Sequence, residues 1–415
     1  MTLIQNMLDS ARAAANVLAT SSSEARNGAL AALAEALVAR QTEILAENAA
    51  DVAEAQKAGR PRAVVDRLAL SPKRVEEMAK ALREVAALPD PLGEIYDLTT
   101  RPNGLVVGRM RISLGVIAMI FESRPNVIPE AGSLCLKTGN AVVLRGGSEA
   151  ARTNGVLGAI LAETLPAAGL PAAAIQVVGD PDRRHVMKLL EARGKIDLLI
   201  PRGGESLIRF VDEHARVPVI LHYKGVCHVY IDREANLEKG LDILENAKVQ
   251  RPGVCNAAEC LLAHADVAKK FLPRATEVLQ ASGVELRGCP RSRAIVPAMK
   301  EATDADWGAE YLDLILAVKV VDSLDEALAH IARYGSSHTE AIVTENYTNA
   351  RKFLAAVQSS CVCVNASTRF NDGGQLGLGA EIGISTTRLH AYGPMGLKEL
   401  TASKFVVLGS GQVRS

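Results

Sequence analysis

Residues 115–147 read GVIAMIFESRPNVIPEAGSLCLKTGNAVVLRGG. Two short apolar runs, residues 115–121 and 141–144, flank a stretch of helical character. A buried strand, a helix and a second buried strand in this order predict a right-handed crossover between parallel strands. The same alternation continues along the chain, and this stretch therefore decides the fold class.

Further short apolar runs follow at residues 175–178, 196–200, 217–222 and 227–231. Amphipathic helical patterns, such as residues 150–168 and 184–192, lie between most of them. Helices that alternate with strands predict an α/β fold, in which a parallel sheet is covered on both faces. This architecture is typical of nucleotide-binding proteins.

A second series follows Cys255, which predicts a second α/β domain. Its expected strands are residues 260–263, 314–321, 341–343 and 361–364, and its expected helices are residues 266–282, 325–334 and 349–357. Because Cys255 lies near the join of the two series, we expect a ligand site there.

Residues 3–87 have apolar positions at helical spacing, with a break at Gly59-Arg60-Pro61. Asn103-Gly104 then predicts a hairpin of residues 97–100 against residues 105–112. An isolated hairpin is rarely stable. We expect it to reach another subunit or to pair with a late strand such as residues 405–408.

The composition excludes several classes of protein. Of the 415 residues, 47 are Lys or Arg and 47 are Asp or Glu, so no excess positive charge predicts a nucleic-acid partner. No apolar stretch reaches the roughly eighteen residues of a membrane span. Acidic residues throughout the first 48 positions argue against a targeting segment, and a cytoplasmic location is expected.

The seven cysteines include no Cys-x-x-Cys pair, which disfavours disulfides and structural zinc. The eight histidines are scattered, and His222 and His228 lie in a strand-like context. We expect structural histidines and no metal site.

Residues 248–259, KVQRPGVCNAAE, contain the candidate nucleophile. Pro252 and Gly253 are expected to end the helix that begins near residue 236, which places Cys255 on a bend. Lys248 and Arg251 nearby would lower the pKa of its thiol. The alternative is a small buried core residue, and spacing alone leaves both interpretations open.

Loops at the carboxyl ends of parallel strands are the expected ligand sites. The first contains Arg145, Gly146, Gly147 and Ser148, and the second contains Arg202, Gly203 and Gly204 before a helix from Glu205. Both suit phosphate binding, although glycine-rich connections also form plain tight turns. The third loop contains Arg124, which could hold an acidic substrate, and Asn126, which could stabilise an oxyanion or cap the next helix.

Residues 253–256, GVCN, resemble the nucleophile segment of the aldehyde dehydrogenase superfamily. Within it, the chain is similar to the γ-glutamyl phosphate reductases, also called glutamate-5-semialdehyde dehydrogenases, of proline biosynthesis. The similar segments are ESRPNV (122–127), SLCLKTGN (133–140), LIPRGG (199–204), NASTRF (365–370) and HAYGPMGL (390–397).

The resemblance implies an aldehyde dehydrogenase-like fold. Residues 1–97 and 114–226 would form an NADP-binding domain, residues 227–390 a catalytic domain, and residues 98–113 and 391–415 an oligomerisation element. It also implies a homo-oligomer, either dimer or tetramer, and glutamate 5-kinase as a partner that makes the substrate.

The implied reaction is NADPH-dependent reduction of L-glutamyl 5-phosphate to L-glutamate 5-semialdehyde and phosphate. Cys255 would be the nucleophile and Asn126 the oxyanion donor, while Arg145 would bind the adenosine ribose of the cofactor and Glu310 its nicotinamide ribose. Arg124, Arg251 and Arg369 are the candidates for binding the substrate's phosphate and α-carboxylate.

Two departures from the superfamily pattern stand out. Residues 221–227, LHYKGVC, lack the glutamate base of hydrolytic aldehyde dehydrogenases, which suits a thioester that must be reduced rather than hydrolysed. Tyr392 stands where the reductases are expected to have arginine. The alternatives are a related acyl-phosphate reductase or aldehyde dehydrogenase with another substrate, a cysteine acyl hydrolase, and a non-catalytic partner of the kinase.

Overall fold

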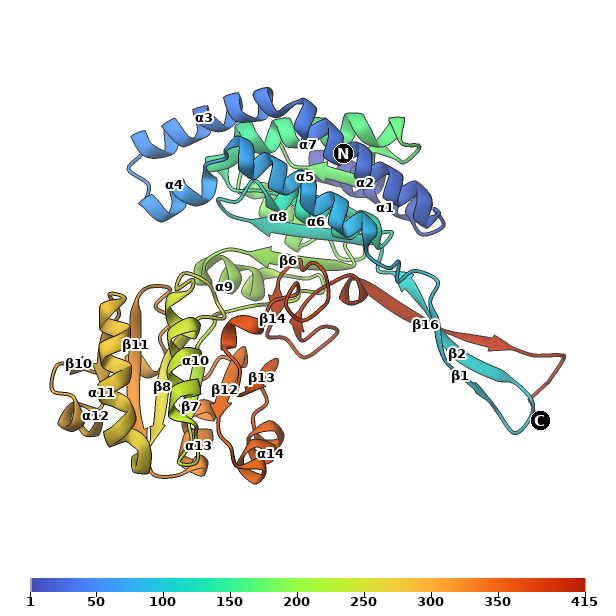
Figure 1. Ribbon diagram of the computed structural model, residues 1–415. Helices are drawn as coiled ribbons and strands as arrows, with labels where there is room; N and C mark the ends of the chain where they lie inside the picture. The colour runs from blue at the N-terminus through green and yellow to red at the C-terminus, as the bar shows by residue number, and fades with distance from the viewer. Residues whose placement is uncertain (1, 415) are drawn as a thin grey trace. The chain divides into compact units, whose positions relative to one another are not determined.

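The computed structural model describes residues 2–414, with the side chain of Ala63 excepted. The described chain divides into two compact units (Figure 1). The first contains the chain up to Leu221 together with Gly377–Gly383 and the part from Met395 onward, and the second contains His222–Leu376 and Ile384–Pro394.

Residues 3–87 are helical, as the apolar spacing predicted, and they form five helices. They are α1 (Leu3–Leu18), α2 (Ser23–Ala39), α3 (Gln41–Lys57), α4 (Arg62–Leu68) and α5 (Pro72–Ala87). Leu30, Leu33 and Leu37 are fully buried on one face of α2. The predicted break at Gly59-Arg60-Pro61 is confirmed between α3 and α4.

Four parallel strands form the sheet of the first unit, in the order β5-β4-β3-β6. They are β3 (Val116–Phe121), β4 (Ala141–Arg145), β5 (Ile175–Val177) and β6 (Leu198–Arg202). The connecting helices are α6 (Val127–Lys137), α7 (Ala151–Ala167), α8 (Arg184–Leu190) and α9 (Glu205–His214), with short 3₁₀ turns η1 (Ser148–Ala150) and η2 (Ala172–Ala174).

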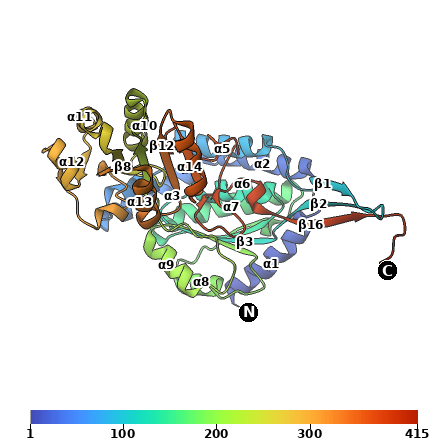
Figure 2. The ribbon, with the colours of Figure 1, turned by 90° about the horizontal axis from the view of Figure 1, so that it is seen from below.

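Both faces of this sheet are covered, which confirms the prediction. Helices α6 and α7 pack on one face, and α1, α8 and α9 gather on the other (Figure 2). Every residue of β3 and β4 is buried. Near-continuous apolar strands are expected where a sheet has no solvent face.

The predicted strand at residues 217–222 is wrong. Only Val219 pairs with Leu199, through a single bridge. Pro218 has no N–H to donate, although its carbonyl accepts from the amide of Leu199 at 2.8 Å. A proline within a short run prevents a regular ladder.

A separate antiparallel sheet of three strands completes the first unit. It contains β1 (Ile95–Thr100), β2 (Val106–Ser113) and β16 (Thr401–Leu408), with η5 (Lys398–Leu400) just before β16. Strand β16 pairs with β2 along its whole length. The hairpin and its pairing with a late strand are therefore confirmed, and the sheet projects from the rest of its unit (Figure 1).

The second unit is built on seven parallel strands in the order β10-β9-β11-β8-β7-β12-β13. They are β7 (Cys227–Ile231), β8 (Ala258–His264), β9 (Glu285–Gly288), β10 (Lys300–Glu301), β11 (Ile315–Val321), β12 (Thr339–Val343) and β13 (Cys361–Val364). The helices are α10 (Leu237–Val249), α11 (Ala265–Ala281), α12 (Pro290–Ile295), α13 (Leu324–Tyr334) and α14 (Tyr347–Ala356). Short elements are η3 (Asp306–Gly308), η4 (Thr368–Phe370), β14 (Ile384–Ser385) and β15 (Gly393–Pro394).

The strands and helices predicted after Cys255 are confirmed in this unit, with ends shifted by one or two residues. Among residues 2–414, none of the helices combines the length and the apolar character needed to cross a membrane.

Asn140 ties the C-terminal segment to the sheet of the first unit. Its buried side chain accepts from the amide of Gly115 and donates to the carbonyl of Leu400, each at 2.8 Å. It also donates to the hydroxyl of Thr138 at 2.8 Å. One amide side chain thus satisfies groups from three segments.

The second unit contains a fully buried ion pair. The Nζ of Lys248 lies 2.7 Å from Oε2 of Glu259, and both side chains are 0% exposed. Burial lowers the pKa of Lys248 and raises that of Glu259, while their attraction opposes both shifts. We expected Lys248 to act on the thiol of Cys255, but its ammonium is paired with Glu259.

We predict that Asn140→Ala lowers the free energy of unfolding by about 2–3 kcal/mol, because it leaves buried backbone groups without partners. Asn16→Ala, an exposed site on α1, is the matched control and should change it by less than about 0.5 kcal/mol. Denaturant unfolding followed by circular dichroism measures both. Equal effects of the two substitutions would contradict the role given to Asn140.

Replacing only one partner of the Lys248–Glu259 pair should lower the free energy of unfolding more than replacing both. Lys248→Met leaves a buried carboxylate uncompensated and should destabilise the protein by about 3–5 kcal/mol, whereas the double variant with Glu259→Leu should recover most of that loss. The exposed Lys269→Met is the control. The measurement is the denaturant midpoint of each variant, and a double variant less stable than Lys248→Met would refute the prediction.

Candidate functional site

The candidate nucleophile lies on a turn in the second unit. Helix α10 ends at Val249, and irregular residues 250–257 lead into β8. The predicted end of this helix before Pro252 and Gly253 is thus confirmed. Cys255 is half-buried, whereas Asn256 and Ala257 after it are buried.

The backbone of Gly225 packs directly against this turn. A Cβ atom on Gly225 would lie 1.9 Å from the carbonyl oxygen of Cys255, so no other residue fits without movement of the backbone. The thiol of Cys227 donates to the same carbonyl at 3.2 Å. The amide of Gly225 donates to Oε1 of Glu310 at 2.8 Å. Glu310 is thereby held beside the segment that contacts Cys255.

Two histidines lie beside Cys255. One ring nitrogen of His222, one of His338 and the sulfur of Cys255 all lie within 4.8 Å of one another. The two rings meet edge to face, with centroids 5.1 Å apart. Sequence reasoning missed both residues as functional candidates, because only the parallel pairing of β7 with β12 brings their segments together.

Two arginines flank the same turn. The Nε of Arg369 donates to Oε1 of Gln250 at 2.8 Å, and its guanidinium also bonds Oδ1 of Asn256. Burial lowers the pKa of Arg369, and the charge of Arg251 lowers it further. Asn256 in turn donates to the carbonyl of Asn371 at 2.9 Å. The cations near the thiol are therefore Arg369 and Arg251 rather than Lys248.

Tyr392, where arginine was expected, has a structural contact. Its hydroxyl bonds the carbonyl of Gln358 and lies 3.2 Å from that of Ser337. The guanidinium of Arg388 lies over its ring, 5.7 Å from the centroid.

In the first unit, the three predicted loops are bonded to one another. The carboxylate of Glu149, after β4, accepts from the amide and the hydroxyl of Ser123, after β3, at 2.7 and 2.6 Å. The carboxylate of Glu122, also after β3, accepts from the amide of Gly204, after β6, at 2.9 Å. The carboxyl ends of the strands thus carry a connected loop cluster.

The loop after β4 is shaped by packing. A Cβ on Gly146 would lie 2.1 Å from the side-chain amide of Asn154, and one on Gly147 would lie 2.2 Å from Glu149. Ser148 begins η1. These close contacts by themselves explain why residues 146 and 147 are glycines, with no need to invoke a bound ligand.

Arg145 is buried in the same loop. Its Nη2 donates to the carbonyl of Pro181 at 2.7 Å, while its buried Nε has no hydrogen-bond partner among residues 2–414. Burial lowers the pKa of its guanidinium. Nε is therefore a donor that remains to be satisfied.

The loop after β6 leads into α9. Gly204 is its N-cap residue, and a carboxylate of the protein, Glu122, already accepts from the amide of Gly204. A Cβ on Gly203 would lie 2.4 Å from the same carboxylate. This helix terminus therefore binds an anionic group, as expected, but the group is the carboxylate of Glu122 and not a phosphate.

The capping alternative for Asn126 is wrong. Asn126 stands at the N-cap of α6, but its side chain makes no cap hydrogen bond and donates instead to Oε1 of Glu130 at 2.8 Å. Burial raises the pKa of Glu130, which the Asn126 bond and the charges of Arg202 and Arg124 oppose. Asn126 is therefore hydrogen-bonded to this carboxyl group, and the two arginines act on it through their charge.

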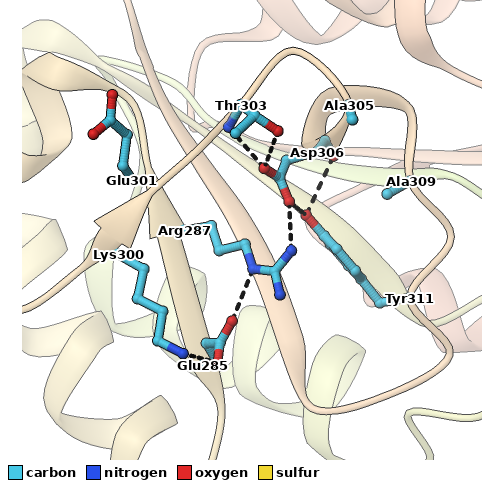
Figure 3. A pocket seen from close by; sticks show the side chains of 9 residues that line it. All are labelled: Glu285, Arg287, Lys300, Glu301, Thr303, Ala305, Asp306, Ala309 and Tyr311. Carbon is cyan, nitrogen blue, oxygen red and sulfur yellow. Dashed lines mark hydrogen bonds and ion pairs between the residues drawn. The ribbon is translucent and has the colours of Figure 1, made fainter.

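An open hollow of about 400 Å³ at the β9–β10 edge contains none of the predicted site residues. Figure 3 shows that four of its charged side chains, Glu285, Arg287, Lys300 and Asp306, are paired with one another, and Glu301 pairs with Arg293 at 3.2 Å. Arg287 contacts Glu285 and Asp306, each at 2.8 Å, and Lys300 contacts Glu285 at 2.5 Å. We interpret this hollow as a structural charge network rather than a substrate site.

Residues 2–302 match the aldehyde dehydrogenase family. A γ-glutamyl phosphate reductase of Nitratidesulfovibrio vulgaris is 57% identical over 99% of this chain and 98% of its own length. Another, of Geotalea daltonii, is 55% identical over 99% of this chain and 98% of its own length.

The solved structures agree. The crystal structure of γ-glutamyl phosphate reductase from Thermotoga maritima superposes with a TM-score of 0.98 at 47% identity, over the full length of both chains. An acetylating aldehyde dehydrogenase of Geobacillus thermoglucosidasius, 17% identical, shares the fold with a TM-score of 0.68 over 99% of this chain and 97% of that one.

A cysteine beside histidines also occurs in acyl hydrolases, so the geometry around Cys255 does not by itself define the reaction. The full-length similarity decides between these classes in favour of an oxidoreductase. The chain belongs to the aldehyde dehydrogenase family and, within it, to the γ-glutamyl phosphate reductases.

Proposed function

We propose that this protein reduces L-glutamyl 5-phosphate to L-glutamate 5-semialdehyde with NADPH, through a thioester on Cys255, in the cytoplasm. The relatives that match its whole length carry the name of this reaction. The observation that carries the proposal is the half-exposed Cys255 on a turn flanked by Arg251 and Arg369. Positive charge near a thiol favours the thiolate, which is the nucleophile.

In the first step the thiolate of Cys255 attacks the acyl carbon. An S–C bond forms, the C–O bond to phosphate breaks, and phosphate leaves with that electron pair. Asn126 and the backbone amide of Cys255 take the role of oxyanion donors, an assignment that rests on the resemblance. Arg124, Arg251 and Arg369 are the proposed partners of the substrate's phosphate and α-carboxylate.

The residues proposed for NADPH have donors that suit its anionic groups. The buried Nε of Arg145 fits an acceptor oxygen. At the α9 terminus, a cofactor oxygen would have to take the place that the Glu122 carboxylate holds at the amide of Gly204. We assign the adenosine end to Arg145, Gly146, Gly147 and Ser148 and to Arg202, Gly203 and Gly204, and the nicotinamide ribose to Glu310. When bound, the nicotinamide supplies the hydride that reduces the thioester.

We further propose a homo-oligomer formed through the three-stranded sheet, with glutamate 5-kinase as the source of substrate. Apolar side chains are exposed on this sheet: Leu98 (52%), Phe405 (67%), Val407 (56%) and Leu408 (55%). Exposed apolar patches on projecting elements are typical of subunit contacts.

Cys255→Ala should abolish the reaction, by at least about a thousandfold in kcat, because the nucleophile is lost. Cys361→Ala, which removes another half-buried thiol of the same unit, should leave most of the activity. The assay is phosphate-dependent oxidation of pyrroline-5-carboxylate, the cyclised product, with NADP and NAD in parallel.

In the same protein, mass spectrometry after incubation with L-glutamyl 5-phosphate and no cofactor should find the acyl adduct on Cys255. An active Cys255→Ala variant, or an adduct on another side chain, would end the proposal. Faster turnover with NAD than with NADP would refute the cofactor assignment alone.

The subunit contact is tested by Phe405→Asp together with Val407→Asp. Charges on the patch should shift the protein toward a smaller species in analytical ultracentrifugation, because they would be buried unpaired in the interface. Leu354→Asp, at an exposed apolar site (45%) on α14, is the matched control and should leave the mass unchanged. An unchanged mass in the Phe405/Val407 variant would place the interface elsewhere.

A further inference from the structure

Three potential ligand atoms meet at Cys255: its own sulfur and one ring nitrogen each of His222 and His338. Thiolate sulfur and neutral imidazole nitrogen are the preferred donors for zinc and similar cations. Zinc–ligand bonds of about 2.0–2.3 Å place ligand atoms about 3.3–3.8 Å apart. Because the three atoms lie within 4.8 Å of one another, movements of about 1 Å bring them to this distance.

The contacts around His338 leave its Nε2 as the candidate ligand atom. The Nδ1 of His338 lies 2.7 Å from the hydroxyl oxygen of Thr339, which also accepts from Asn371 Nδ2 at 2.7 Å, and 3.7 Å from the sulfur of Cys227. When Nδ1 carries the proton, it can donate to either of these atoms. A neutral imidazole that is protonated at Nδ1 has its lone pair at Nε2.

The Nε2 of His338 is buried and has no hydrogen-bond partner among residues 2–414. A buried acceptor without a partner is costly, which makes it a place where a ligand is expected.

The exposure of the three residues suits a site that is open on one side. His338 is fully buried, while Cys255 and His222 are only partly so. Three protein ligands with one open position are typical of accessible zinc sites, in which water takes the fourth place.

A second triad in the same unit lacks these properties. His228, Cys260 and His330 are also within ligand distance of one another, but all three are buried. The ammonium of Lys319 lies 3.2 Å from Nδ1 of His330 and donates to it. The proton of neutral His330 is then on Nε2, the nitrogen that faces Cys260 at 3.8 Å, and Nε2 has no lone pair for a metal.

We propose that Cys255, His222 and His338 form a reversible binding site for a thiophilic divalent cation such as Zn²⁺, which blocks the nucleophile while it is bound. Binding replaces the thiol proton, which passes to water, by a metal–sulfur bond, and no electrons are transferred. This departs from our sequence-based expectation of no metal site. The site itself is independent of the reaction, whereas the blocking effect rests on the proposed function.

The test uses Co²⁺ as a spectroscopic probe on the full-length, metal-free protein without substrate. Wild type should bind one equivalent and show the intense near-ultraviolet band of a cobalt–thiolate bond. Cys255→Ala should lose this band, and His338→Gln and His222→Gln should each weaken binding by about 10-fold or more. Zn²⁺ should displace the probe with one-to-one stoichiometry.

His214→Gln and Cys361→Ala are the matched controls, because His214 is an exposed histidine of α9 and Cys361 is a half-buried thiol outside the triad. Both should bind Co²⁺ as wild type does. Circular dichroism of each variant shows whether it is folded, and the two histidine variants give independent readings if one of them is not. An unchanged cobalt band in folded Cys255→Ala, or unchanged affinity in both histidine variants, overturns the proposal.

A separate assay tests the blocking effect. Micromolar Zn²⁺ should inhibit wild-type turnover, and a chelator should restore it. In His338→Gln, the Zn²⁺ concentration needed for half inhibition should rise by about the same factor as the loss of Co²⁺ affinity in that variant. Cobalt binding without inhibition would retain the site and refute the block. Loss of the proposed reaction with an intact cobalt spectrum would refute the function alone.

Discussion

The close contact between Gly225 and the carbonyl of Cys255 is the constraint on which the second unit's site depends. With a Cβ position only 1.9 Å from that oxygen, residue 225 must be glycine. The contact holds residues 222–227 against the turn that contains Cys255. The hydrogen bonds from Cys227 to the carbonyl of Cys255 and from Gly225 to Glu310 fix the position of this segment along the turn. His222 is placed beside the sulfur by the same packing.

The charges of this unit divide into two groups. Lys248 and Glu259 are fully buried and neutralise one another. This pair is therefore part of the protein interior and does not face an incoming ligand. Arg251 is exposed and Arg369 is half-buried, and Arg369 is held by Gln250 and the Asn256 side chain. Cations that stay partly in water can pair with an incoming anion, whereas a buried ammonium that is already paired cannot.

The predictable part of the fold followed from local patterns. Apolar runs gave the strands, and the Asn103-Gly104 turn gave the hairpin, because hydrophobic periodicity and turn chemistry act over a few residues. The prediction of a strand at residues 217–222 is wrong because Pro218 interrupts the hydrogen-bond ladder, and the apolar pattern alone does not reveal this. The resemblance identified Cys255, but His338 lies 83 positions further along the chain, and only the pairing of distant strands brings it there.

Residues 221–227 lack the glutamate base of hydrolytic aldehyde dehydrogenases, and two imidazoles, those of His222 and His338, lie beside Cys255 instead. Hydrolysis of a thioester needs a base that can deprotonate water, and a base is effective when its pKa lies near the working pH. Burial moves the pKa of His338 well below its ordinary value, so this imidazole accepts hydrogen bonds but removes protons from water poorly. A thioester beside it would persist long enough for reduction. The Nε2 of this imidazole, buried and without a hydrogen-bond partner among residues 2–414, is also the atom on which the proposed metal site depends.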